Sequence, residues 1–216
     1  MTLELLGLSV SQGDAQPLFG PLTLTVAAGE VATIMGPSGV GKSTLLDAIG
    51  GHIAHGFTAA GRIVLNGRDV TALPAEARRI GLMFQDAALF PHLSVGDNLA
   101  FGLAATVRGR AARRARVDEA LALAGLGGLY DRDPTTLSGG QRARAALMRT
   151  LLCEPQAVLL DEPFSGLDPG LRSAVRAFAF DHIRARGIPA ILVTHEPADA
   201  AAAGGSVLDL PATVAR

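Results

Sequence analysis

The feature that most narrows the folds open to this chain is a glycine-rich loop, Gly-Pro-Ser-Gly-Val-Gly-Lys-Ser, at residues 36–43. An apolar segment, residues 31–35, precedes the loop, and residues 42–49 place their leucine and isoleucine side chains on one helical face. Glycines between a strand and a helix let successive backbone N–H groups converge on one phosphate. The N-terminus of the helix adds its dipole to the same anion site. The spacing therefore predicts an α/β protein that binds a nucleotide.

Roles within this loop follow from position. We expect nucleotide contacts from Gly36, Pro37, Ser38, Gly39, Val40, Gly41, Lys42, Ser43 and Thr44. Lys42 would reach the β- and γ-phosphates, Ser43 would hold Mg²⁺, and Thr44 would donate to the α-phosphate. The competing interpretation is a glycine-rich turn with an accidental lysine, which the flanking strand and helix disfavour. The loop alone does not distinguish a kinase, a GTPase or a pump.

Two carboxylates, Asp161 and Glu162, directly follow the apolar segment 157–160. Parallel strands present ligands at their carboxyl ends, so both side chains are expected at the nucleotide edge of a sheet. Asp161 suits the water shell of Mg²⁺. Glu162 is placed to polarise the attacking water as a general base. The alternative is that the two residues only cap a helix or end a solvated strand.

A second candidate anion site begins at Ser138, which is followed by Gly139, Gly140 and Gln141. Ser138 and Gln141 have the spacing of a capping box at a helix start. The two glycines leave backbone N–H groups uncovered, as a phosphate requires. Two anion sites in one chain make sense if each nucleotide is clamped by the first site of one subunit and the second of its neighbour. An ordinary capped helix is the alternative.

Hydrophobic patterning supplies the fold class. It predicts strands at residues 3–10, 22–26, 31–35, 63–65, 80–84, 157–160, 188–194 and 207–210, and helices at 42–49, within 94–126, from 138 and at 171–183. Alternating strands and helices predict an α/β fold with a mainly parallel core sheet. The early alternating strands predict an antiparallel β subdomain beside it. We expect one domain, 1–216, with a core at about 1–85 and 157–216 and an inserted α-helical subdomain at about 86–156.

Composition excludes several classes of protein. Hydrophobic residues make up 49% of the chain and charged residues 18%, which is typical of a globular protein and not of a disordered one. The net charge of −1 gives no electrostatic case for nucleic acid as a partner. No run of about 18 apolar residues is present, so we expect no membrane span. The single cysteine, Cys153, permits no internal disulfide and is expected to be a small core residue.

Taken together, five motifs make the chain resemble the nucleotide-binding subunit of ABC transporters, within the P-loop NTPases, over nearly its whole length. They are the loop at 36–43, Gln85 after its strand, Leu-Ser-Gly-Gly-Gln at 137–141, the acidic segment 161–168 and His195 after Ile-Leu-Val-Thr. The resemblance implies that Gln85 senses Mg²⁺ and the γ-phosphate, with Ser43 and Asp161 as the other metal ligands. It also implies that His195 holds the γ-phosphate and the attacking water in line for Glu162.

The resemblance further implies partners. Two subunits would close head-to-tail around two ATP molecules, with Ser138, Gly139, Gly140 and Gln141 on the ATP of the opposite subunit and Asp168 reporting across the interface. The sequence leaves open whether this dimer is a homodimer in the full complex. The membrane partner would be an ABC permease, and indirectly a solute-binding protein, with no nucleic acid involved. The chain would act at the cytoplasmic side of the inner membrane.

Residues 85–95, with Asn98 and Leu99, resemble the importer subgroup, in which this stretch lines the groove for a permease coupling helix. The most similar importers serve thiamine, iron, sulfate or polyamine uptake, and the cargo is not encoded here. The alternatives are an exporter or lipid-extracting ATPase, or a soluble ABC ATPase acting on DNA or ribosomes.

Three features depart from the family pattern. Gln12 stands where an aromatic residue usually stacks on adenine, with Phe19 as a possible substitute, so selectivity for ATP over GTP is in question. Position 166 is glycine, a change that we expect to loosen its loop. The chain ends soon after residues 207–210, so we expect no cargo-sensing domain.

Overall fold

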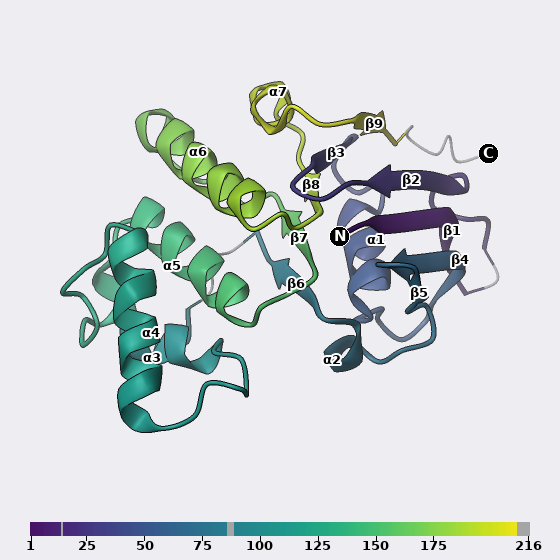
Figure 1. Ribbon diagram of the computed structural model, residues 1–216. Coiled ribbons are helices and arrows are strands. Elements are labelled where there is room, and N and C mark those ends of the chain that lie inside the picture. Colours follow the sequence, from purple (N-terminus) through teal and green to yellow (C-terminus); the bar gives the residue numbers. More distant parts are fainter. Residues whose placement is uncertain (14, 86–88, 211–216) are drawn as a thin grey trace. The chain divides into compact units, whose positions relative to one another are not determined.

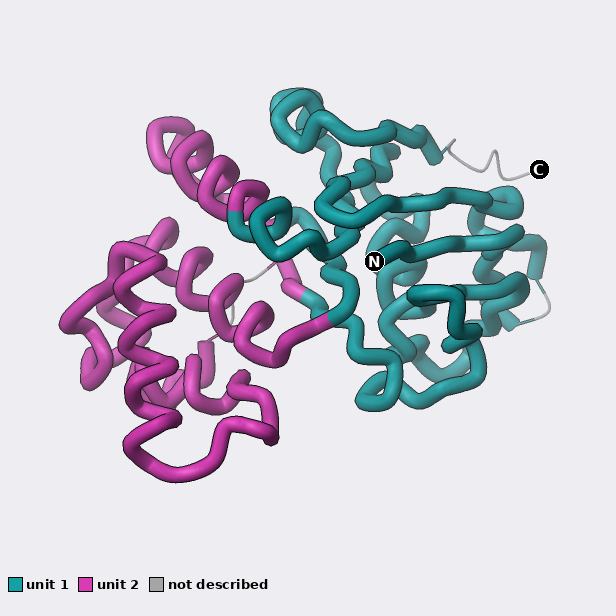
Figure 2. Tube along the Cα trace, viewed as in Figure 1, with its two compact units in different colours: residues 1–82, 156–162, 182–216 teal, residues 83–155, 163–181 magenta. Residues whose placement is uncertain are grey.

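The computed structural model describes residues 1–13, 15–85 and 89–210 (Figure 1). The chain divides into two compact units (Figure 2). The first unit comprises Met1–Leu82, Gln156–Glu162 and His182–Arg216, and the second comprises Met83–Pro155 and Pro163–Asp181. Each unit is described by itself below.

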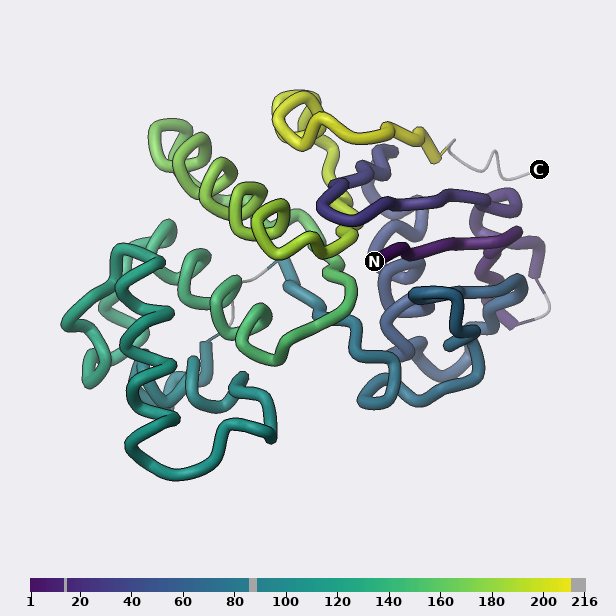
Figure 3. Tube along the Cα trace, in the orientation of Figure 1, coloured from purple at the N-terminus to yellow at the C-terminus, as the bar shows by residue number. Residues whose placement is uncertain are grey.

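The first unit contains a five-stranded sheet in the order β6-β7-β8-β3-β9. Its strands are β6 (Ile80–Met83), β7 (Ala157–Asp161), β8 (Ala190–Val193), β3 (Val31–Met35) and β9 (Val207–Asp209). The pairs β7–β8, β8–β3 and β3–β9 are parallel. In Figure 3 the early strand β3 lies between two strands from the end of the chain. The predicted α/β class with a parallel core sheet is thus confirmed.

A separate four-stranded antiparallel sheet, in the order β2-β1-β4-β5, belongs to the same unit. Its strands are β1 (Leu3–Gln12), β2 (Leu22–Val26), β4 (Phe57–Leu65) and β5 (Arg68–Asp69). The predicted antiparallel subdomain is therefore confirmed. The sequence predicted only the last three residues of β4. Its first half, rich in alanine and exposed, is a strand because it pairs with the end of β1.

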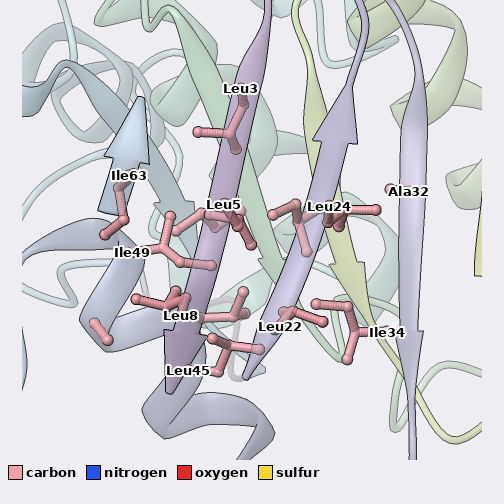
Figure 4. Packing of buried hydrophobic residues seen from close by; sticks show 14 of the residues in the cluster. Leu3, Leu5, Leu8, Leu22, Leu24, Ala32, Ile34, Leu45, Ile49 and Ile63 are labelled. Atoms are coloured by element: carbon pink, nitrogen blue, oxygen red, sulfur yellow. The ribbon is translucent and has the colours of Figure 1, made fainter. Parts of the chain in front are cut away.

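The core of the first unit forms where α1 (Lys42–Gly50) packs against β1 and β7. Leu45 and Ile49 of α1 lie close to leucines of β1 in Figure 4, and all of these side chains are buried. Gly51 follows the last residue of the helix, and its N–H donates to the Asp47 carbonyl. The buried Arg78 donates to the carbonyls of Ala48 and Ile49, the last turn of α1. Its charge compensates the negative end of the helix dipole.

The first unit also contains two short helices, α2 (Ala75–Arg78) and α7 (Pro197–Ala203). The helices of the second unit are α3 (Val95–Phe101), α4 (Arg110–Leu123), the 3₁₀ turn η1 (Pro134–Thr136), α5 (Gly139–Leu152) and most of α6 (Pro169–Ala185). In this unit α3 packs against both α4 and α5. Within the described part of the chain, no helix is long and apolar enough to cross a membrane.

Two expectations for the second unit need correction. The predicted helical stretch 94–126 is two helices, α3 and α4, because the chain turns after α3. A Cβ on Gly102 at that turn would overlap the Arg149 carbonyl, so the backbone passes too close to α5 for a side chain. Cys153 was expected in the core but is exposed, because it follows the last residue of α5. Residues 86–88 of the predicted permease groove lie outside the described residues.

Candidate nucleotide-binding site

The glycine-rich loop connects β3 to α1, and two of its glycines are required by the geometry. Gly41 has a φ of +99° and stands immediately before α1, a conformation that residues with a Cβ rarely adopt. A Cβ on Gly36 would come within 2.9 Å of the Leu210 carbonyl oxygen, and one on Gly41 within 2.9 Å of the Leu18 side chain. The loop therefore needs glycine for close packing as well as for its turn.

Lys42 is the first residue of α1 and is buried, with 6% of its surface exposed. Its ammonium group donates to the carbonyl oxygens of Gly36 at 2.8 Å and Pro37 at 2.9 Å. No side chain caps the N-terminus of α1, and its first turn holds no acidic residue. A buried cation and an uncapped helix N-terminus thus lie together, which suits a polyphosphate ligand.

Asp161 ends β7, and its carboxyl group hydrogen-bonds to the hydroxyl of Ser43 on α1. Burial is the largest influence on this carboxyl and raises its pKa. The hydrogen bond from Ser43 and the charge of Lys42 lower the pKa, while the charge of Glu162 raises it. Burial also raises the pKa of Asp47, one turn along α1 from Ser43, and Asp161 adds to that rise. The carboxyl group of Asp161 therefore lies near two other carboxyl groups, those of Asp47 and Glu162, and near the ammonium group of Lys42.

Glu162 follows β7 and has a φ of +41°, in the left-handed region. This conformation costs about 1–2 kcal/mol for a residue with a Cβ, so the strand end is strained. The Glu162 N–H donates to the Val193 carbonyl at the end of β8. Atom Oε1 of Glu162 lies 3.1 Å from Nδ1 of His195, which comes two residues after Val193. The structure thus brings together the two predicted catalytic residues of this unit.

The second unit contains the Ser138 segment, where the predicted capping box is confirmed. The Ser138 Oγ accepts from the Gln141 N–H at 3.3 Å, and the Gln141 side chain accepts from the Ser138 N–H at 2.9 Å. Gly139 and Gly140 lie between them, and Cβ atoms there would lie 3.2 Å from Leu167 and 3.3 Å from Val175. No partner for the N–H groups of these two glycines occurs among the described residues. The helix start is therefore fixed internally yet leaves two donors available.

Gln85 and the segment that leads to Asp168 also belong to the second unit. Gln85, Gly139, Arg142, Ser165 and Gly166 are among the residues that line one cavity of about 380 Å³. Gly166 has a φ of +70°, so a glycine suits this position. The exposed Asp168 precedes α6, and its carbonyl accepts from the N–H groups of Leu171 and Arg172. Gln85 and Gly166 therefore lie in the same cavity as Gly139, the first residue of α5, within one unit.

Phe19, offered above as a possible substitute for the usual aromatic contact to adenine, does not fit that role. Phe19 is only 3% exposed and packs in the hydrophobic core, so its ring is unavailable to a ligand. Gln12 is exposed at the end of β1 and is paired across the sheet with Phe57 of β4. The sequence missed this pairing because the segment around Phe57 has few strand-forming residues.

Sequence comparisons agree on one family. A family model described as ABC transporter matches residues 19–165. The chain is 49% identical over 189 residues to the uncharacterized ABC transporter ATP-binding protein YnjD of Escherichia coli strain K12, covering 88% of this chain and 86% of YnjD.

Two further relatives are named as importers. The thiamine import ATP-binding protein ThiQ of Cereibacter sphaeroides is 46% identical, with 82% of this chain and 75% of ThiQ covered. The Fe(3+) ions import ATP-binding protein FbpC 1 of Rhizobium meliloti is 43% identical over 87% of this chain. The chain spans only about half of that relative, 52% of its length. The chain therefore belongs to the ABC transporter family as one of its ATP-binding proteins, which are ATPases.

Proposed function

We propose that this chain is the ATP-hydrolysing subunit of an importer, working as a head-to-tail dimer at the cytoplasmic face of a membrane and driving a separate permease. The observation that carries the proposal is the contact between Glu162 and His195, at 3.1 Å, in the unit that also holds the phosphate loop. A base beside a polarising imidazole at the carboxyl edge of a parallel sheet is suited to phosphoryl transfer to water.

Binding of ATP would rest on the phosphate loop. The Lys42 ammonium, now held by the carbonyls of Gly36 and Pro37, would turn to the β- and γ-phosphates. The uncapped N–H groups at the start of α1 would bind the same phosphates. This exchange of partners replaces neutral carbonyls with phosphate oxygens and so makes stronger, charge-assisted hydrogen bonds.

The residues beside the loop fit Mg²⁺. The Ser43 hydroxyl and the Asp161 carboxylate already share a hydrogen bond, so two oxygen ligands of the kind that Mg²⁺ prefers stand together. Gln85 would contribute a third oxygen. A bound Mg²⁺ would offset negative charge on the phosphates.

In the hydrolytic step, Glu162 would take a proton from water as the water oxygen attacks the γ-phosphorus. The bond from that phosphorus to the bridging oxygen of ADP would break, and inorganic phosphate would leave. His195, which touches the Glu162 carboxylate, would donate to a γ-phosphate oxygen from its other ring nitrogen. The left-handed backbone of Glu162 fits this role, since strain of this kind is retained where geometry serves function.

The Ser138 segment would complete the site of the opposite subunit. Its capping box fixes the helix start, and the N–H groups of Gly139 and Gly140, which have no partner among the described residues, would bind an anion. Asp168, exposed before α6, would report across the same interface. A single subunit would then hold only half of each nucleotide site.

Import is favoured over export by the relatives that are named for iron and thiamine import.

The segment after Gln85 supports a docking role. Buried Asn98 accepts from the Phe90 N–H at 2.7 Å and donates to the Phe90 and Leu93 carbonyls. Phe101, 70% exposed, stacks edge-on against Phe90 at 5.0 Å. An exposed ring at the end of α3, packed against an anchored loop, suits contact with a permease helix. Adjacent genes for a permease and a solute-binding protein would support import, and a gene for a long exporter-like membrane protein would favour export.

The Glu162→Gln variant tests the proposal. We expect it to bind ATP with unchanged affinity in calorimetry, because the proposal assigns binding to the phosphate loop and assigns Glu162 to the attacking water. Its turnover should fall by about 10²- to 10⁴-fold, as for loss of a general base. Light scattering should show an ATP-dependent dimer. Hydrolysis at a rate near that of the wild type would remove Glu162 from its proposed role.

A further inference from the structure

The turn that carries His195 is held by a side-chain clamp between Thr194, which precedes His195, and Asp199, which has no role in the site described above. Thr194, only 2% exposed, precedes His195, and Glu196 follows it. The Thr194 hydroxyl donates to the carboxylate of Asp199 at 3.2 Å and accepts from the Glu196 N–H at 3.1 Å. One hydroxyl group therefore joins the residues on both sides of His195 to a carboxylate on α7.

The clamp is tied to the sheet on one side and to a helix on the other. The Thr194 N–H donates to the Ile34 carbonyl of β3 at 3.3 Å, which extends the ladder past the end of β8. The Asp199 N–H donates to the Glu196 carbonyl at 3.0 Å, in the first turn of α7. His195 is the one residue between these two attachment points, so its backbone has little freedom.

Burial of the Asp199 carboxylate indicates more than helix capping. Asp199 is 3% exposed, and burying a carboxylate is costly unless hydrogen bonds compensate for its lost hydration. If the Asp199 side chain lay on the surface, its carboxylate would interact just as favourably with the dipole of α7, because it is in the first turn. Here the carboxylate instead accepts a hydrogen bond from Thr194, the residue before His195. The His195 side chain is 48% exposed, and its Nδ1 lies 3.1 Å from Oε1 of Glu162.

We propose that Asp199, acting through Thr194, is a positioning residue that holds His195 against Glu162. The inference rests on the proposed function, because it assumes that the geometry of the His195 and Glu162 pair limits hydrolysis. A displacement of about 1 Å at such a pair can cost about 100-fold in rate. Nucleotide affinity depends on the phosphate loop instead, so loss of the clamp lowers kcat and leaves KM for ATP unchanged.

Two pairs of variants test the clamp. Thr194→Val removes the hydroxyl and keeps the side-chain shape, whereas Thr194→Ser restores the hydroxyl. Asp199→Ala removes the acceptor, whereas Asp199→Asn keeps an oxygen that can accept from Thr194. We expect Thr194→Val and Asp199→Ala to lower kcat by about 10- to 100-fold, and the conservative variants to recover most of the loss. Thr23→Val, which deletes a hydroxyl that accepts from the Gly7 N–H in the antiparallel sheet, is the matched control.

A spectroscopic readout separates this inference from the proposed function. The chain has five histidines, and the ring ¹⁵N resonances of His195 can be assigned by their loss in His195→Gln. We expect these resonances to shift in Thr194→Val and Asp199→Ala but not in Thr23→Val. If both variants only lower Tm, with kcat and the His195 resonances unchanged, Asp199 merely caps α7 and the inference is wrong. If the resonances shift while His195→Gln itself hydrolyses ATP normally, Asp199 and Thr194 do position His195, but His195 has no part in hydrolysis and its proposed role is wrong.

Discussion

The strand end at Glu162 and the helix start at Ser138 are both predicted to address ATP, yet they are built in opposite ways. Glu162 has a left-handed backbone and lies against a half-exposed imidazole. Ser138 begins α5 with an extended backbone, and its capping box with Gln141 satisfies both residues. The strained backbone thus lies where we propose that a proton moves, and the unstrained helix start lies where we propose that an anion only binds.

The comparison suggests different sensitivities for the two regions. The first unit combines a buried ammonium, crowded carboxylates and a strained residue, so single changes there should affect chemistry or ligand affinity. The Ser138 segment presents backbone N–H groups on a stable helix start, so changes there should affect assembly. The predictions below test this separation.

The largest effect on binding is expected from Lys42→Ala. It removes the only ammonium group of the chain's phosphate loop, and hydrogen bonds to charged groups contribute about 1.5–3 kcal/mol each. ATP affinity should fall by about 100-fold or more in calorimetry. Arg62→Ala is the control, since Arg62 forms an exposed ion pair with Asp69 in the antiparallel sheet. Unchanged affinity in Lys42→Ala would show that Lys42 does not bind ATP. It would also contradict the idea that changes in the first unit affect ligand affinity whereas changes at Ser138 affect assembly.

Ser138→Arg should have a different effect. The long charged side chain would obstruct the second half-site, so the ATP-dependent dimer should be lost while each monomer still binds ATP as tightly as the wild type. Light scattering with and without ATP, beside calorimetry, measures both. A dimer that persists in this variant would mean that the helix start does not face the partner's nucleotide.

Strain at Glu162 gives a smaller, measurable effect on stability. Glycine adopts positive φ without a Cβ clash, so Glu162→Gly should be more stable than Glu162→Ala by about 1 kcal/mol. Both variants lose the carboxylate and should be inactive, so the comparison isolates the backbone. Denaturant unfolding followed by circular dichroism provides the difference. Equal stabilities would show that the left-handed conformation costs nothing.

The smallest effect is expected from Ser138→Ala. It removes the acceptor for the Gln141 N–H and should lower the free energy of unfolding by about 1 kcal/mol, the typical value of a helix N-cap. Ser138→Asn, which can cap the helix equally well, should keep the stability of the wild type. If alanine were as stable as serine, the helix start would not depend on its cap.

Local patterns predicted much of this molecule. The phosphate loop is set by glycines and a lysine within eight residues, and the capping box by Ser138 and Gln141 three residues apart, so neighbouring residues alone specify them. Buried strands such as β3 and β7 were also predicted, because both faces of a parallel strand are apolar. These features need no information from distant parts of the chain.

Features that depend on distant partners were not predicted. The first half of β4 is a strand only because β1 pairs with it. The Arg78 side chain is buried because carbonyls of α1, thirty residues earlier in the chain, accept its hydrogen bonds. The left-handed backbone of Glu162 and the Asp199 clamp could not be predicted from the sequence either, since glutamate and aspartate favour neither arrangement by themselves. Tertiary packing selects these conformations after the local elements have formed.

The central claim is that each nucleotide is held by the phosphate loop of one subunit and the Ser138 segment of another. In a Cys153→Ser background, which removes the only cysteine, one chain would carry Ser38→Cys and a second would carry Ser138→Cys. Mixed with ATP and a mild oxidant, the two chains should form a disulfide-linked dimer on a non-reducing gel, and omission of ATP should prevent it. A mixture that stays monomeric in the presence of saturating ATP, while each chain still binds the nucleotide, would contradict the account.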